Sequence, residues 1–577
     1  MVNEKNKRIL LLDSILLGVV GAFGAQVFLF CLHLVEHYSA LLTTEADSHG
    51  WPGTGGTLIQ SVSHNHHLMV IAVIVFGGLI SGILVYTFAP EAEGHGTDTA
   101  VRAFHRTGGL IRACVTPLKM IASALTIGTG GAAGREGPTA LFSAGIGSIY
   151  ATIKKSSNRE RRLLVLVGMA AGLSAIFKSP IGTAIFAVEV LYGEMEFEAS
   201  ALVYTLLGSV VAYMVSGFFV GWQPLFDVSQ NLLVTDPETI FYLLILGGVS
   251  GLIGVILPNV FYGIRDLFHK MPIAPHFKPA IGALGVGLIA IAFPQVLGGG
   301  YGWIQKAMDG QIFIWILPAI IIAKMLAFSF TVSSGGSGGV FAPSLFLGAL
   351  LGSFLALLFH QSTAVFAMIG MAAVFGAAAR VPIATVIMVT EMTGGYRLLA
   401  PAALTVLLAY LLQVSLVSMF NLKYKSLYEA QVPDRSFSPV HQIDELRNIL
   451  SFYTPKLSLN PKRINRADLL SLLESSIPID IPNGKQIFFG SLKNDYPKFD
   501  DDSKCELFYM KYKDAEVMAM FRDGSWIYPQ CGIDLQKGDE LLLMGVPDVI
   551  GKIRIDFNSV SRTFSQLSLQ QQKLDQS

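Results

Sequence analysis

The stretch Gly168-Met-Ala-Ala-Gly-Leu-Ser-Ala-Ile-Phe-Lys-Ser-Pro180-Ile-Gly-Thr-Ala-Ile-Phe-Ala-Val-Glu189 occurs a second time, without gaps, as Gly370-Met-Ala-Ala-Val-Phe-Gly-Ala-Ala-Ala-Arg-Val-Pro382-Ile-Ala-Thr-Val-Ile-Met-Val-Thr-Glu391. Ten of the 22 aligned positions are identical. Two helices rich in glycine and alanine resemble each other by composition alone, but a shared proline and glutamate at fixed spacing favour a duplicated unit. Repeats with a binding site at their interface are typical of membrane transporters and channels.

The repeat continues upstream, where Pro138 pairs with Pro343. Each proline follows a glycine-rich turn, Gly130-Gly-Ala-Ala-Gly-Arg-Glu-Gly-Pro138 in the first repeat and Gly335-Gly-Ser-Gly-Gly-Val-Phe-Ala-Pro343 in the second. Proline suits the first turn of a helix, and glycine lets backbone N–H groups approach a ligand. We therefore expect two helix N-termini, whose free N–H groups and positive dipole ends favour an anion. Glycine hinges or helix-packing contacts are the alternative.

The composition places this repeat in a membrane. The chain has 577 residues, of which 52% are hydrophobic and 14% are charged, against about 25% charged residues in a typical soluble protein. The last 147 positions hold 38 of the charged residues, so the chain divides near residue 430 into an apolar and a polar part. The net charge of zero argues against a nucleic-acid-binding protein and against an acidic disordered chain.

Apolar stretches in the first 430 residues predict an all-α, multi-pass membrane protein. They cover 9–35, 68–88, 117–130, 163–177, 181–192, 201–220, 239–262, 279–293, 311–330, 344–359, 364–378, 383–392 and 398–420. Several are shorter than the roughly 20 residues that a membrane-crossing helix needs, which indicates broken helices around a protein-lined cavity. Basic residues at 5–8, at 154–162 and in the polar part indicate that both chain ends are cytoplasmic.

Glu136 stands in the first glycine-rich turn, in a region with few other charges. An ionisable residue at membrane depth points to function. A carboxylate aimed at an anion site competes with the permeant ion and leaves when it is protonated, which makes a gate sensitive to pH and voltage. The alternative is a glutamate held in a salt bridge by the adjacent Arg135.

These motifs resemble those of the CLC family of chloride channels and chloride/proton exchangers, over about residues 9–430. Gly134-Arg-Glu-Gly-Pro138 and Gly339-Val-Phe-Ala-Pro343 match two of the family's signature motifs. The resemblance implies an inverted repeat of broken helices, 9–220 and 239–430, in a homodimer with one chloride pore in each subunit. It implies a transport protein of the cell (inner) membrane, in contact with the lipid bilayer. We expect no enzymatic activity and no cofactor.

The resemblance also assigns residues to the pore. It implies that Glu136 is an external gate and that Tyr428 is an inner gate whose hydroxyl points at the anion. The chloride-binding positions that it implies are Gly94, His95, Gly96, Arg135, Gly137, Val340, Phe341 and Tyr428. No metal site is expected, because His64, His66 and His67 lack a fourth ligand and indicate a polar loop.

Two positions depart from the family's pattern. His95 replaces a common serine, so an imidazole either donates to the anion or turns away and leaves only backbone contacts; preference among chloride, nitrate and fluoride stays open. Val190 stands where exchangers usually carry a proton-transfer glutamate. A passive gated chloride channel is therefore the first expectation and a chloride/proton antiporter the alternative. In the antiporter, Glu194, Glu196 and Glu198 offer a substitute proton route, although a solvated cluster is the expected state of these three residues.

The polar part predicts a small cytoplasmic α+β domain over 431–558, with short alternating strands that include 506–511, 517–522 and 540–545. Residues 480–553 resemble the TrkA-C/RCK regulatory module. The resemblance implies a regulatory domain that binds an unidentified small molecule or that only dimerises. A potassium-transport component is a further alternative, but no potassium-filter sequence is visible. The tail 559–577 is expected to be disordered.

Overall fold

The computed structural model describes residues 4–43, 67–228, 232–435, 438, 441, 478–481, 485–493, 515–522, 525–527 and 535–558. The chain forms two compact units, Met1–Pro433 and Asp434–Ser577. The predictions for His64, His66, the strand at 506–511 and the tail at 559–577 lie outside the described residues.

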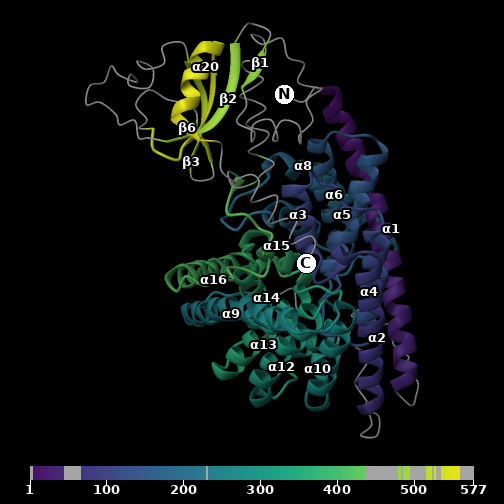
Figure 1. Ribbon diagram of the computed structural model, residues 1–577. Helices are drawn as coiled ribbons and strands as arrows, with labels where there is room; N and C mark the ends of the chain where they lie inside the picture. The colour runs from purple at the N-terminus through teal and green to yellow at the C-terminus, as the bar shows by residue number, and fades with distance from the viewer. Residues whose placement is uncertain are drawn as a thin grey trace. The chain divides into compact units, whose positions relative to one another are not determined.

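The first unit consists of helices, which Figure 1 colours from purple to green along the chain. Its first half contains α1 (Glu4–Thr43), α2 (His67–Phe88), η2 (Pro90–Ala92), α3 (Thr97–Arg106), α4 (Val115–Gly128), α5 (Glu136–Ile153), α6 (Asn158–Phe177), α7 (Pro180–Glu189) and α8 (Ala199–Val220). Its second half contains α9 (Pro237–Lys270), η3 (Pro275–Phe277), α10 (Lys278–Ala292), η4 (Pro294–Val296), α11 (Tyr301–Met308), η5 (Ile314–Ile316), α12 (Leu317–Ser333), α13 (Phe341–Leu358), α14 (Thr363–Ala379), α15 (Pro382–Thr393), η6 (Tyr396–Leu398) and α16 (Leu399–Met419).

The mixture of long and short apolar helices confirms the predicted fold class. Eight described helices are long and apolar enough to cross a membrane, whereas α4, α7, α14 and α15 are apolar but shorter. The helices α5 and α13 begin at Glu136 and Phe341, as the two glycine-rich turns predict. The short helices α3 and α11 were not expected. A search for apolar runs misses them, because α3 carries six polar or charged residues among its ten.

The matched ends of the two repeats cap each other. Glu391, near the end of α15, accepts hydrogen bonds at the start of α7, from the Ser179 hydroxyl (2.6 Å) and from the amides of Ile181 (3.1 Å) and Gly182 (2.9 Å). Each helix end thus lies beside the start of the other helix, so α7 and α15 run antiparallel.

The reciprocal contact is made by the other glutamate of the repeat. Glu189, the last residue of α7, accepts from the amides of Ile383 (3.1 Å) and Ala384 (2.7 Å) at the start of α15. A carboxylate at a helix N-terminus satisfies free N–H groups and complements the helix dipole. The glutamates that reveal the repeat in the sequence therefore join its two halves.

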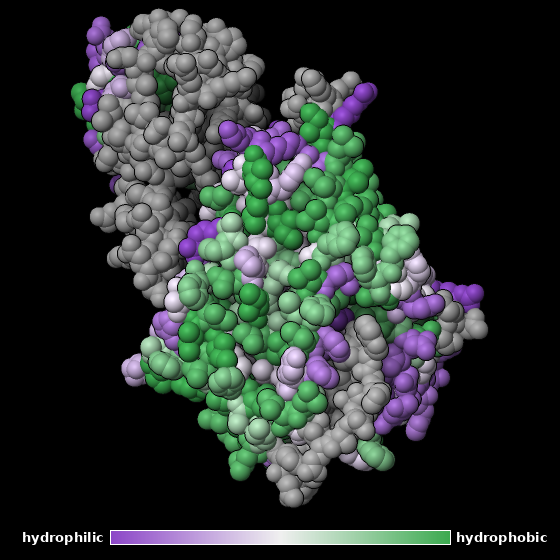
Figure 2. Space-filling model, turned by 90° about the vertical axis from the view of Figure 1, so that its right-hand side faces the viewer, coloured by the Kyte–Doolittle hydropathy of each residue, from purple (hydrophilic) through white to green (hydrophobic). Residues whose placement is uncertain are grey.

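Much of the outer surface of this unit is apolar. Figure 2 shows hydrophobic residues over much of one face, with hydrophilic residues near its upper edge and along its right-hand side. Large side chains such as Phe218, Phe313 and Trp315 are 80% or more exposed. A broad apolar surface of this kind suits contact with lipid rather than with water.

The second unit contains an antiparallel sheet with the strand order β1-β2-β5-β3-β4, and β6 also pairs with β2. The elements are β1 (Ile479–Ile481), β2 (Lys485–Leu492), β3 (Ala515–Arg522), β4 (Ser525–Ile527), β5 (Glu540–Gly545), α20 (Pro547–Ile553), η8 (Arg554–Asp556) and β6 (Phe557–Asn558). Ile550 and Ile553 of α20 pack on Leu541 and Leu543 of β5. The expected alternation is wrong for β5, whose six residues are all buried, because a central strand covered on both faces favours a continuous apolar run.

Candidate functional site

Three loops that precede helices meet in the interior of the first unit. Gly134 and Gly339 exchange backbone hydrogen bonds, with N···O distances of 2.8 Å from Gly134 and 2.6 Å from Gly339. The amide of Gly338 donates to the carbonyl of Gly94 (3.2 Å). The starts of α3, α5 and α13 are therefore drawn together, and their free N–H groups and dipoles create a region that favours an anion.

Glycine is required where these loops touch. A Cβ atom on Gly137 would lie 2.1 Å from the carbonyl oxygen of His95. Gly96 has a φ of +83°, and a Cβ atom there would lie 2.9 Å from the carbonyl oxygen of Gly137. No larger residue fits such a close backbone approach. The structure thus brings together all of the predicted chloride-binding positions in α3, α5 and α13: Gly94, His95, Gly96, Arg135, Gly137, Val340 and Phe341.

Glu136 lies buried at the centre of this region, with 2% of its surface exposed. Among the described residues, neither carboxylate oxygen meets a donor at full hydrogen-bond geometry, although the amides of Glu136 and Ala342 lie close to it. The Nε atom of Arg135 is 3.9 Å from one carboxylate oxygen, and its guanidinium lies over the ring of Tyr301 at 4.8 Å. The proposed salt bridge is therefore a loose ion pair, and the carboxylate faces the amides of α5 and α13.

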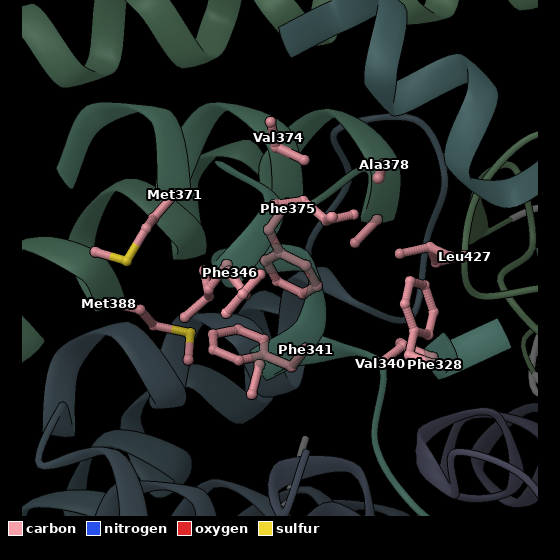
Figure 3. Packing of buried hydrophobic residues seen from close by; sticks show 14 of the residues in the cluster. Phe328, Val340, Phe341, Phe346, Met371, Val374, Phe375, Ala378, Met388 and Leu427 are labelled. Atoms are coloured by element: carbon pink, nitrogen blue, oxygen red, sulfur yellow. The ribbon is translucent and has the colours of Figure 1, made fainter. Parts of the chain in front are cut away.

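Tyr428 closes the other side of the site and is also buried. Its hydroxyl bonds to the Thr97 side chain at the start of α3. Its ring lies 5.5 Å from the His95 ring and 6.4 Å from the Phe375 ring, measured between centroids. Phe375 in turn packs on Phe341 at 4.3 Å, and Figure 3 shows these two rings side by side at the start of α13. Aromatic side chains therefore cluster next to the starts of α3 and α13.

A tyrosine that the sequence analysis missed holds Tyr428 in place. The buried hydroxyl of Tyr262 donates to the carbonyl of Leu427 (2.7 Å) and accepts from the amide of Glu429 (3.2 Å). These are the residues on either side of Tyr428. Arg265 covers the ring of Tyr262 at 4.3 Å and pairs with the Glu429 carboxylate at 2.5 Å. No sequence signal marked Tyr262, because its partner segment is more than 160 residues away.

The structure gives His95 a partner that neither expectation named. Its Nε2 atom lies 3.1 Å from a carboxylate oxygen of Asp98, one helical turn further on. Its Nδ1 atom is buried and has no hydrogen-bond partner among the described residues. Asp98 also accepts from the amide of Ala430 (3.2 Å), two residues after Tyr428. The ring is thus fixed by a carboxylate on one nitrogen and left open on the other.

Two buried lysines occupy matching positions in the repeats, and the sequence analysis overlooked both. Lys119 donates to the carbonyls of Ala92 (2.8 Å) and Gly94 (2.7 Å), just before α3. Lys324, 205 residues later, donates to two carbonyls just before α11, at 2.7 Å each. Both side chains are fully buried. A charged residue inside each apolar stretch was the signal that would have found them.

Val190, the predicted proton-relay position, is fully buried directly after α7, and its side chain cannot carry a proton. Of the three nearby glutamates, Glu194 is exposed and Glu196 is partly buried. The expected solvated state is wrong for Glu198, which is 6% exposed and accepts from the Tyr192 hydroxyl (3.1 Å). The chain before α8 folds back on the end of α7 and covers this carboxylate.

No described group of three or more His, Cys, Asp or Glu residues is arranged to hold a metal ion.

Comparisons with known proteins agree with this architecture. A sequence model of the protein family described as "Voltage gated chloride channel" matches residues 77–414. The "H(+)/Cl(-) exchange transporter ClcA" of Salmonella agona is 31% identical over 371 residues, which cover 62% of this chain and 78% of the relative. The protein of the same name from Salmonella newport is equally similar.

Solved structures give the same fold. The crystal structure of a slow cyanobacterial Cl-/H+ antiporter matches with a TM-score of 0.62 and 22% identity, over 73% of this chain and 96% of that one. The structure of a CLC-type fluoride/proton antiporter matches with a TM-score of 0.64 and 22% identity, over 75% and 100% of the two chains. The predicted repeat of broken helices is thereby confirmed as the fold of the first unit.

Proposed function

The chain belongs to the CLC family of chloride transport proteins, and we propose that it exchanges chloride for protons across the membrane. The observation that carries this proposal is Glu136. Its buried carboxylate faces helix amides that suit an anion, and no described donor holds it at full hydrogen-bond geometry. The similar proteins are named as chloride/proton exchangers, which supports the antiporter over the passive channel that the sequence favoured first.

The geometry explains how one carboxylate links the two ions. The ionised carboxylate of Glu136 and a chloride ion compete for the same N–H groups at the starts of α5 and α13. Protonation removes the negative charge, so the side chain loses its attraction to the amides and chloride takes its place. Release of the proton lets the carboxylate return and displace chloride. Alternation between these two states moves a proton and chloride in opposite directions.

The passive channel is the second candidate, and Val190 is the observation that favours it. A valine at this buried position offers no proton acceptor. Purified protein in liposomes separates the two functions when chloride efflux and internal pH are recorded together. An antiporter drives protons uphill when a chloride gradient is imposed, and a channel moves chloride without protons. The antiporter proposal fails if chloride flux is fast and no uphill proton movement accompanies it.

We further propose that the protein is a homodimer in the cell (inner) membrane, with both chain ends in the cytoplasm, and that it has no cofactor and no enzymatic activity. Chloride is the preferred ion, because the family and the similar exchangers are named for it. Fluoride is the ion to test beside it, because His95 alters the lining of the path.

The second unit is proposed to be a cytoplasmic regulatory domain. Its antiparallel sheet and short helix support the resemblance of residues 480–553 to the TrkA-C/RCK module. Either a small-molecule ligand or dimerisation alone fits this role. Flux from protein truncated after residue 433, compared with full-length protein, tests whether this unit regulates transport.

A further inference from the structure

We propose that His95, held by Asp98, is the proton acceptor on the Tyr428 side of the exchange path. This inference rests on the proposed chloride/proton exchange and deepens it. It gives a role to a buried ring nitrogen that chloride binding alone does not explain.

The first argument is the asymmetry of the ring's two nitrogens. The Nε2 atom pairs with the Asp98 carboxylate at 3.1 Å, so Nε2 carries a hydrogen. In the neutral ring, Nδ1 then holds a lone pair that accepts a proton. Nδ1 is buried without a described partner, in a side chain that is 6% exposed. A buried polar atom without a partner destabilises the fold, and such an atom calls for a functional reason.

The second argument is that His95 has a neighbour at each of the two gates. The backbone of His95 touches Gly137, which is the residue after Glu136. The ring of Tyr428 lies 5.5 Å from the His95 ring, and Tyr428 interacts electrostatically with both Asp98 and Glu136. His95 and Glu136 are therefore linked through two shared neighbours, Gly137 and Tyr428.

The charges around the ring suit temporary protonation. Asp98 stabilises the imidazolium form, and Arg102 acts electrostatically on Asp98. Lys119 binds the carbonyl of Gly94, the residue before His95, and disfavours a second positive charge nearby. The ring therefore has a negative group on one side and a positive group near its backbone.

The transfer is balanced in protons and charge. A hydrated proton (H3O+) on the Tyr428 side gives its proton to the Nδ1 lone pair of His95 and leaves a water molecule, while the Nε2 hydrogen stays beside Asp98. The proton then leaves Nδ1 for the Glu136 carboxylate, and the ring returns to its neutral form. Neutral Glu136 releases the helix amides, and chloride occupies them and moves in the opposite direction. No other reactant is needed.

Glu198 is the competing acceptor. Its carboxylate is buried near Val190 but already accepts from the hydroxyls of Tyr192 (3.1 Å) and Ser200 (2.8 Å). The Nδ1 atom of His95 has no described partner, so His95 is the better candidate, and Glu198 supplies a direct comparison in the test.

The experiment records chloride efflux and uphill proton movement in liposomes for wild type, His95→Gln and Glu198→Gln. His269→Gln, at the exposed end of α9, is the matched control. In His95→Gln, proton movement per chloride should fall by about 10² or more, the usual size of a positioned acid–base group. Chloride efflux should fall much less than proton movement, because the amides of α5 and α13 remain. Elution of each variant as a single species on gel filtration checks its folding.

Asp98→Asn provides a second variant. An asparagine keeps an acceptor for the amide of Ala430 but removes the charge that stabilises the imidazolium. Proton movement per chloride should fall while chloride efflux continues. A purely structural role for Asp98 would lower chloride efflux and proton movement together, and that result would count against the pair.

The outcomes separate this inference from the proposed function. Coupled exchange in wild type that persists in His95→Gln would overturn the inference and leave the antiporter standing. Loss of coupling in Glu198→Gln alone would assign the proton to Glu198. Absence of uphill proton movement in wild type would overturn the antiporter and this inference together.

Discussion

The start of α5 and the start of α13 share a backbone arrangement but differ in their side chains. Both loops contain glycines that exchange hydrogen bonds, and both helices have proline as their third residue. The first loop places Arg135 and Glu136 where the second places Val340 and Phe341. The amides that suit an anion are therefore common to both repeats, whereas the group that titrates is present in one. The backbone that both repeats share therefore provides the amides for an anion, and Glu136, which has no titratable counterpart in the second repeat, provides the gate.

The two buried lysines show the same relation at a distance from the gate. Each donates to two carbonyls of a loop that precedes a short helix. The loop at Lys119 carries the His95–Asp98 pair, whereas the loop at Lys324 leads to Tyr301 in α11. The two loops are therefore held by the same lysine–carbonyl contacts but carry different side chains.

The largest expected effect comes from breaking the shared backbone. Gly137→Ala places a methyl group 2.1 Å from the carbonyl oxygen of His95. We expect a loss of about 3 kcal/mol in stability and no measurable chloride flux. Thermal unfolding and liposome efflux check this prediction. Gly94→Ala is the control, because a Cβ atom there meets nothing within 4 Å and only the positive φ is strained, at about 1–2 kcal/mol.

The next largest effect is expected from Glu136→Gln, which removes the carboxylate that only the first loop carries and leaves the backbone unchanged. Glu136→Gln leaves chloride without its competing charge and leaves the proton without its carrier. We expect chloride efflux to lose most of its dependence on pH, and uphill proton movement to fall by about 10² or more. Chloride efflux and internal pH over a series of pH values provide the measurement. Wild-type pH dependence in the variant would show that another group gates the path.

The reciprocal glutamate caps give a smaller effect that compares the repeats directly. Glu391→Ala removes the acceptor of a hydroxyl and two amides, whereas Glu189→Ala removes the acceptor of two amides. Loss of a charged cap costs about 1–3 kcal/mol, and we expect Glu391→Ala to be the more destabilising variant. Unfolding midpoints in detergent test the order. Equal midpoints would mean that the Ser179 contact adds nothing.

The smallest effect distinguishes the two lysines. Lys119→Met removes a positive charge beside the loop of His95 and should weaken chloride binding by about 1 kcal/mol, or roughly fivefold. Lys324→Met should leave chloride affinity closer to wild type, because its loop carries no titratable pair. Calorimetric chloride titration of both variants provides the comparison. A stronger effect from Lys324→Met would place the anion nearer to α11.

Much of the fold was readable from local patterns. The apolar stretches of the sequence predicted most of the helices. The glycine-rich turns with Pro138 and Pro343 predicted the starts of α5 and α13. The short helix α3 was not predicted, because its many polar residues do not form an apolar run. Glu136 was identifiable because a charge in an apolar stretch stands out without any knowledge of its neighbours.

The sequence by itself therefore determined the membrane class, the repeat, the helix starts and the presence of a titratable gate. Each of these depends on residues close together in the chain, where backbone preference and hydropathy act. The tertiary structure alone decided which groups meet. Glu391 meets the start of α7, and His95 meets Asp98 beside Tyr428. Glu198 is buried, although a solvated residue was expected. The antiparallel packing of helices about 200 residues apart sets those contacts. A side chain's partner, and hence the chemistry that it performs, follows from that packing and not from its neighbours in sequence.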